Sequence, residues 1–202
     1  MPMATSTRTR RNVAALANAG WGLVLTPDCT NRHGFAAVGI DNGAWGCFQR
    51  KVDWTPERWQ PLVERHPDAR WAVAPDIVCG GAESLARSVS WLPWLLARQQ
   101  TVLIAVQNGM TAKEIAPLVG PRVGIFVGGD SEWKEQSLPV WGRLAAQTGC
   151  YLHVGRVNTA RRIRLCAMAG ADSFDGTSAT KFSSTVPLIT NAAAQTALRL
   201  DT

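Results

Sequence analysis

The stretch "TVLIAVQNGMTAKEIAPLVGPRVGIFVGGD" (residues 101–130) contains two short apolar runs separated by a helical pattern. The runs 101–109 and 123–129 are rich in Val and Ile and are apolar at consecutive positions, which is typical of parallel strands buried on both faces. Between them, Thr111 and Glu114 stand three residues apart, which is the spacing of a helix capping box. Two buried strands joined by a helix make a β-α-β unit, so this stretch predicts a parallel sheet.

The same unit recurs along the chain. Five further apolar runs, each with Asp, Gly or Arg at or near its end, cover residues 22–28, 35–45, 69–78, 151–157 and 171–177. Helical patterns lie between the runs, and "ITNAAAQTALRL" (189–200) reads as a last helix. This alternation predicts an α/β domain whose parallel sheet is either closed as a barrel or open and doubly wound.

The distribution of polar residues favours the barrel. They follow nearly every run instead of one pair of runs, and the chain lacks both the G-x-G-x-x-G fingerprint and the P-loop. We therefore predict a compact TIM-like (β/α)8 barrel, irregular or incomplete because only seven runs are clear. An eighth strand would come from the N-terminal segment or from the tail after Phe182. We expect residues 15–202 to form this single catalytic domain and residues 1–14 to be a flexible, basic N-terminus.

Composition narrows the function classes. No apolar run approaches the roughly 18–20 residues that cross a bilayer, so no membrane partner is expected. The five cysteines are scattered without a C-x-x-C pair, which predicts reduced thiols, no metal site and no cofactor. No signal-peptide pattern follows the N-terminal arginines, so we expect a cytoplasmic protein. The net charge of +6, mostly from arginine, suits a nucleic-acid partner and equally an arginine-rich protein without one.

The polar residues at the strand ends would face one mouth of the barrel. They are the side chains of Asp28, Asp41, Asp76, Gln107, Arg156 and Asp175, together with the backbone amides of Gly128 and Gly129. Two carboxylates flanking a sugar–base bond are what glycosyl chemistry requires, one as nucleophile and one as proton carrier. A remaining carboxylate and an amide match the donor edge of a purine. The rim has too many acids for a phosphate site.

Several of these stretches resemble motifs of the tRNA-guanine transglycosylases. "GADSFDGT" (170–177) resembles the family's strand that ends in Phe-Asp, "IAVQNG" (104–109) its Val-Gln-Gly strand, and "IFVGGDSEWK" (125–134) its Gly-Gly strand. "WAVAPDIV" (71–78) and "IDNGAWGCF" (40–48) stand where the family has its base-recognising Asp and its second catalytic Asp. The segment from Tyr151 to Asp175 resembles the turn, helix and nucleophile strand in order and spacing, so the resemblance covers about residues 35 to 182.

The resemblance implies a role for each matching residue. Asp175 would attack C1′ of a guanosine nucleotide and form a covalent glycosyl-enzyme, while Asp41 would carry the proton of the leaving and incoming base. The purine would be read by Asp76, Gln107, Gly128 and Gly129. Trp45 would stack on a base, and the target nucleotide would be flipped out or single-stranded. The flanking phosphates would be held by Arg156, Arg161, Arg164 and Lys181.

The family's zinc site of three cysteines and a histidine has no counterpart in these residues. The chain therefore resembles more closely the short, zinc-free relatives of phages and mobile elements that are associated with 7-deazaguanine bases in DNA. This implies exchange of guanine for a free purine or 7-deazapurine base, in DNA in preference to tRNA. An N-glycoside hydrolase and a non-catalytic base-binding paralogue are the alternatives, and a homodimer or a partner in a modification complex stays open.

Several of these residues also have plain structural interpretations. Asp175 before Gly176, and Asp41 before Asn42, fit turn positions as well as catalytic ones. Asp172 lies on the opposite face of the strand from Asp175, because side chains alternate, and is expected to bond backbone amides. His153 lies within a strand and is expected to be a hydrogen-bonded core histidine.

Overall fold

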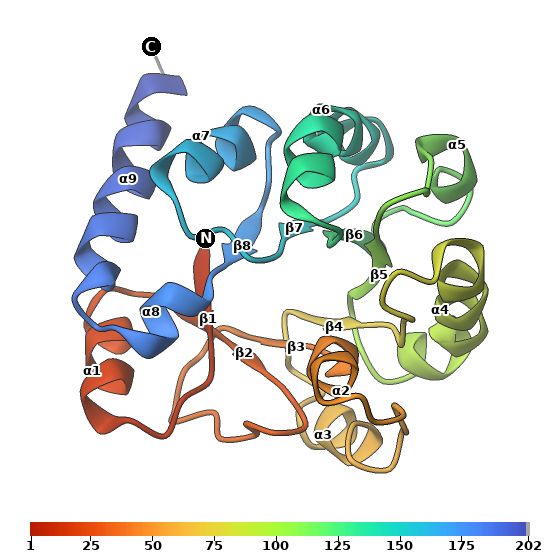
Figure 1. Ribbon diagram of the computed structural model, residues 1–202, viewed down its shortest axis with the longest axis horizontal. Helices are drawn as coiled ribbons and strands as arrows, with labels where there is room; N and C mark the ends of the chain where they lie inside the picture. Colours follow the sequence, from red (N-terminus) through yellow and green to blue (C-terminus); the bar gives the residue numbers. More distant parts are fainter. Residues whose placement is uncertain (201–202) are drawn as a thin grey trace.

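A ring of eight parallel strands, surrounded by helices, is the framework of the computed structural model (Figure 1). The structure describes residues 1–200 and the side chains of residues 1–194. The strands are β1 (Pro2–Thr5), β2 (Gly22–Leu25), β3 (Val38–Ile40), β4 (Trp71–Val73), β5 (Val102–Val106), β6 (Val123–Val127), β7 (Leu152–Val154) and β8 (Ser173–Asp175). Each strand pairs in parallel with the next, and β1 pairs with β8 to close the sheet. The predicted (β/α)8 barrel is confirmed.

Helices follow the strands and cover the outside of the barrel (Figure 1). They are α1 (Arg10–Asn18), α2 (Ala44–Arg50), α3 (Gln60–Arg65), α4 (Gly81–Leu96), α5 (Ala112–Ile115), α6 (Ser131–Thr148), α7 (Ala160–Met168), α8 (Thr177–Lys181) and α9 (Thr185–Leu200). The predicted capping box of Thr111 and Glu114 is present at the start of α5. Within residues 1–200, none of the helices has both the length and the apolar character that crossing a membrane demands.

The N-terminus is ordered, and the expectation of a flexible segment over residues 1–14 is wrong. Residues 2–5 form β1, whose side chains Met3 and Ala4 are fully buried, and α1 begins at Arg10. The eighth strand thus comes from the N-terminal segment, one of the two expected sources, although "PMAT" is too short and lacks the β-branched run that would identify it. Its backbone hydrogen bonds to β2 and β8 remove two open sheet edges, so closure of the barrel supplies the ordering that the local sequence does not.

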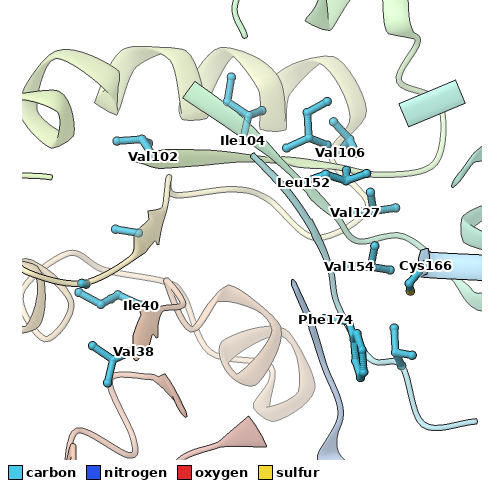
Figure 2. Close-up of a cluster of buried hydrophobic side chains, with 14 of the residues drawn as sticks. Val38, Ile40, Val102, Ile104, Val106, Val127, Leu152, Val154, Cys166 and Phe174 are labelled. Carbon is cyan, nitrogen blue, oxygen red and sulfur yellow. The ribbon is translucent and has the colours of Figure 1, made fainter. Parts of the chain in front are cut away.

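Alternation along each strand separates two apolar layers. Figure 2 shows the outer one, which contains side chains from β3, β5, β6, β7 and β8 together with Cys166 of α7. Leu152 and Val154 of β7 and Phe174 of β8 point into this outer layer. Because neighbours along a strand point to opposite faces, the side chains between and beside them line the inside of the barrel.

The inside of the barrel is a separate cluster that is apolar at its base. It consists of Met3, Val24, Trp71, Val73, Leu103 and Ala105, with Phe126 and Tyr151 packed against it. The indole of Trp71 occupies space that a side chain on β3 would fill: a Cβ at Gly39 would lie 2.3 Å from a Trp71 ring carbon. The interior is therefore packed, and the buried polar side chains of His153 and Ser173 come from β7 and β8.

Candidate active site

Three carboxylates meet at the mouth formed by the C-terminal ends of the strands. Asp41 directly follows β3, Asp76 lies three residues after β4, and Asp175 is the last residue of β8. The negative charges of Asp76 and Asp175 both act on Asp41, so the three side chains share one electrostatic environment. The structure thus brings together three of the four acids that the strand-end pattern singles out, whereas Asp28 pairs with Arg50 and Arg58 instead.

Asp41 is the acid whose protonation is most affected. Burial, reinforced by the charges of Asp76 and Asp175, raises the pKa of Asp41 to about 7. The backbone N–H of Gly43 donates to Asp41 Oδ1 at 2.6 Å and opposes this rise. The turn interpretation of the Asp-Asn-Gly sequence is confirmed, and the Asp41 carboxyl also interacts electrostatically with the other two carboxylates. An acid with this pKa exchanges protons near neutral pH.

Asn42 connects the ends of β3 and β4. Its amide nitrogen donates to the Ala74 carbonyl and to Asp76 Oδ1, both at 2.8 Å, and its side-chain oxygen accepts from the Ala44 N–H. Burial raises the pKa of Asp76, and the hydrogen bond from Asn42 opposes the shift. The sequence does not indicate a role for Asn42 at the site, because an Asn before Gly is typical of a turn. The structure makes it the buried link that orients Asp76.

Asp175 is buried, and a hydrogen bond to each oxygen fixes the orientation of its carboxylate. Its Oδ2 lies 3.0 Å from His153 Nε2, and its Oδ1 accepts the backbone N–H of Arg156 at 3.2 Å. The Asp175 carbonyl also accepts the N–H of Val157, which ties the loop after β7 to β8. Asp175 is therefore an inward-facing, anchored carboxylate at the mouth.

Asp172 occupies the opposite face of the same segment. Its carboxylate accepts the backbone N–H of Leu152 at 2.8 Å, and its carbonyl accepts the N-terminal ammonium of Met1. The predicted scaffold role is confirmed, although the amide that it bonds lies on β7 and is not local in sequence. The two aspartates of "DSFD" thus serve different faces because they are an odd number of positions apart.

Lys134 is a buried cation close to Asp175 that the sequence analysis missed. It lies on the first turn of α6, is 3% exposed, and donates to the carbonyl of Gly155. Burial and the charges of Arg156 and Arg162 lower the pKa of Lys134 to about 8, while Asp175 opposes the shift. The sequence "SEWKEQ" does not indicate that Lys134 is buried, because a lysine in a helix is usually exposed to solvent.

Trp45 and Arg156 form a contact across the mouth. The Arg156 guanidinium lies 4.7 Å from the centroid of the Trp45 ring and also donates to the Gly129 carbonyl. Trp45 belongs to the segment after β3, whereas Arg156 follows β7, four strands further round a ring of eight. The indole is 43% exposed and stacks on Phe48. Trp45 and Arg156, which the resemblance assigns to base binding and to phosphate binding, therefore contact each other.

Gln107 and the two glycines have partners within the protein. The Gln107 amide donates to the Ile77 carbonyl and to Ser84 Oγ, and its oxygen accepts the Cys79 N–H. Both amide hydrogens are thus used to hold the loop after β4. The Gly128 N–H is bonded to the Val106 carbonyl, and the Gly129 carbonyl accepts from Arg156. In this structure these residues support the loops of the mouth.

The remaining basic residues lie on the surface. Arg161 pairs with Glu135 of α6, and Arg164 is exposed one turn further along α7. Lys181 is exposed at the end of α8, which begins directly after Gly176. Asp28 is an exposed loop residue that pairs with Arg50 and Arg58. Among the described residues, the charge of Lys134 interacts with Asp175, the charge of Arg87 acts on Asp76, and Arg156 donates its backbone N–H to Asp175.

Within the part of the chain that the structure describes, no three His, Cys, Asp or Glu side chains are grouped so as to hold a metal ion. The site is thus described by its carboxylates, its buried histidine and lysine, and the Trp45–Arg156 contact. Comparison with known proteins found no family model and no curated protein that matches the chain.

Proposed function

We propose that this protein is a base-exchange transglycosylase that replaces guanine with a 7-deazaguanine-type base in nucleic acid, DNA in preference to tRNA, in the cytoplasm. The observation that carries the proposal is the pairing of two unlike carboxylates at one mouth. Asp175 is anchored by two donors, whereas burial and its acidic neighbours raise the pKa of Asp41 to about 7. Glycosyl transfer with retention needs this combination of a fixed nucleophile and a proton carrier.

The chemistry follows from these two environments. Asp175 would form a bond from a carboxylate oxygen to C1′, and the C1′–N9 electron pair would leave with guanine, which takes a proton from Asp41. In the second half, Asp41 as carboxylate would accept the proton from the incoming base, whose nitrogen attacks C1′ and releases Asp175. The protonation change of Asp41 in each half matches a pKa near neutrality.

The polar and aromatic groups above the carboxylates support a nucleic-acid substrate. Arg156 would contact a phosphate beside the target nucleotide, and the exposed ring of Trp45 would stack on a base. Because Asp175 is buried and Asp41 and Asp76 are only partly exposed, the reacting nucleotide would enter flipped out or from a single strand. Asp76, oriented by Asn42, remains the carboxylate available to the purine edge.

A labelled-base experiment tests the proposal. Wild-type protein is incubated with radiolabelled guanine and with single-stranded DNA, duplex DNA or tRNA in parallel, and label in the polymer is counted. We expect incorporation into DNA above that into tRNA, and loss of incorporation by at least about 10³-fold in Asp175→Asn. The matched control is Asp172→Asn, which changes the same residue type on the outer face, retains an oxygen acceptor for Leu152, and should keep near wild-type incorporation.

Each alternative gives its own result. Release of guanine without incorporation indicates an N-glycoside hydrolase, in which water resolves the covalent intermediate. Binding of oligonucleotide without release or incorporation indicates a non-catalytic paralogue and contradicts the proposed function. A trapped Asp175–DNA adduct, isolated after denaturation and absent from Asp175→Asn, would identify the nucleophile directly.

A further inference from the structure

A continuous chain of hydrogen bonds runs through the barrel interior behind Asp175. Tyr151 Oη donates to Ser173 Oγ at 2.9 Å, Ser173 Oγ lies 2.7 Å from His153 Nδ1, and His153 Nε2 lies 3.0 Å from Asp175 Oδ2. Tyr151 directly precedes β7, His153 lies on β7, and Ser173 and Asp175 lie on β8, with His153 and Ser173 as register partners. Their shared parity places them all on the inner face. The proposed transglycosylase reaction assigns no role to the three residues behind Asp175.

The chain has one consistent direction when Asp175 is ionised. A carboxylate only accepts, so His153 Nε2 must carry the hydrogen that it donates to Oδ2. Burial lowers the pKa of His153, against the opposing effect of Asp175, so the ring is neutral and Nδ1 carries no hydrogen. Nδ1 then accepts from the Ser173 hydroxyl, and Ser173 Oγ accepts from Tyr151. Every polar atom of His153 is paired.

The imidazole is also held on its faces. The ring of Phe126 stacks on it with centroids 4.8 Å apart, and Trp71 lies 4.6 Å away at a tilt of 52°. Gly155 leaves the space for this arrangement, since a Cβ there would lie 2.9 Å from Phe126 and 3.4 Å from Asp175 Oδ2. The ring is fully buried, so the donor of Oδ2 has a fixed position that water does not reach.

We propose that His153, backed by Ser173 and Tyr151, is the positioning residue of Asp175: it holds Oδ2, so that Oδ1, which accepts the Arg156 N–H at 3.2 Å and keeps a further lone pair, is the atom that attacks C1′. This rests on the proposed function of the site. When Oδ1 bonds to C1′ and the C1′–N9 pair leaves with the base, Oδ2 becomes the ester carbonyl and keeps its bond from Nε2–H. The reverse step returns the C1′–Oδ1 pair to the carboxylate, and no proton moves along the chain.

The hydrogen-bond chain is tested without any substrate. The protein has three histidines, so a sample labelled with ¹⁵N-histidine gives three imidazole systems, and the one lost in His153→Phe is assigned to His153. We expect this imidazole to be in the neutral Nε2–H tautomer at about pH 6.5, where an ordinary histidine is half protonated. The charges that act on it are Asp175, Lys134 and the N-terminal ammonium. Asp175→Asn should shift its Nε2 resonance, and Asp172→Asn should leave it unchanged.

Kinetics then test the positioning role. Loss of one hydrogen bond to a charged group predicts a fall in kcat of about 10- to 100-fold in His153→Phe, with KM for the oligonucleotide nearly unchanged. His153→Gln carries an N–H at about the place of Nε2 and should recover most of the loss. Near-UV circular dichroism and urea unfolding confirm that both variants are folded.

Two results would overturn the inference. One is an His153 ring that titrates near pH 6.5 or carries its hydrogen on Nδ1, and the other is wild-type kcat in a folded His153→Phe. If the wild-type protein catalyses no exchange, the positioning role falls together with the proposed function. The nitrogen shifts still report whether the hydrogen-bond chain exists, so the two failures are distinguished.

Discussion

The two sides of the barrel mouth carry the same residue type in different environments. On the β3–β4 side, Asp41 accepts one backbone N–H and faces two other carboxylates, and its pKa rises to about 7. On the β7–β8 side, Asp175 accepts from a buried histidine and a backbone N–H, with the cation of Lys134 nearby. The comparison teaches that neighbours, and not residue type, separate a carboxyl group with a raised pKa from an anchored carboxylate.

Within this comparison, the largest expected effect is on the rate of guanine release and comes from replacing Asp41, the proposed proton carrier. Asp41→Asn should reduce the rate of guanine release by about 10²- to 10⁴-fold, since the leaving base then lacks its acid. In the wild-type protein this rate should fall above the pKa of Asp41, about 7, because the acid form is lost. Single-turnover release measured from pH 5 to pH 9 checks both points. A wild-type profile that Asp41→Asn leaves intact apart from its height would remove Asp41 from the mechanism.

The next largest effect is on the free energy of unfolding and comes from the packing of Gly39 against Trp71 inside the barrel. Gly39→Ala should lower the free energy of unfolding by about 3 kcal/mol, because the new Cβ would lie 2.3 Å from the buried Trp71 ring, which also supports His153. Urea denaturation measures the change. Gly20→Ala is unsuitable as a control because Gly20 has a positive φ, whereas a Cβ at Gly120 meets open space. Gly120→Ala should therefore change stability by less than about 1 kcal/mol.

The acid of the β3–β4 side also makes stability depend on pH. An Asp in an unfolded chain has a pKa near 3.9, whereas folding raises the pKa of Asp41 to about 7, so the folded state binds this proton more tightly. The contribution to stability is therefore present below about pH 4 and is lost as pH rises towards 7. Asp41→Asn should gain about 2 kcal/mol more stability, relative to wild type, at pH 8 than at pH 5. Urea unfolding at the two pH values measures this difference; an equal effect at both would contradict the shifted pKa.

The smallest effect concerns the contact that joins the two sides. Trp45→Ala removes the ring beneath the Arg156 guanidinium and should change the free energy of unfolding by less than about 1 kcal/mol. The affinity for a single-stranded oligonucleotide should fall about 5-fold or more if the ring stacks on a base. Fluorescence anisotropy with a labelled oligonucleotide measures it. Phe48→Ala, which removes the other exposed ring of this pair, serves as the control and should affect affinity less.

Much of the fold could be predicted because its signals are local. Continuous apolar runs and helical segments identified seven strands and the barrel class, and the parity of Asp172 and Asp175 separated scaffold from mouth. The strand β1 could not be predicted, because its order comes from hydrogen bonds to β2 and β8, far away in sequence. The contacts of Gln107 with the loop after β4 could not be predicted for the same reason.

The sequence by itself determined which carboxylates follow which strands, since strand ends and side-chain alternation are properties of the local chain. Only the tertiary structure decided the protonation and the orientation of those carboxylates. The protonation of Asp41 depends on burial and on charges from two other strands, and the orientation of Asp175 depends on His153, Ser173 and Tyr151 lying behind it. Electrostatic shifts and buried hydrogen bonds are pairwise effects through space, so barrel closure sets them.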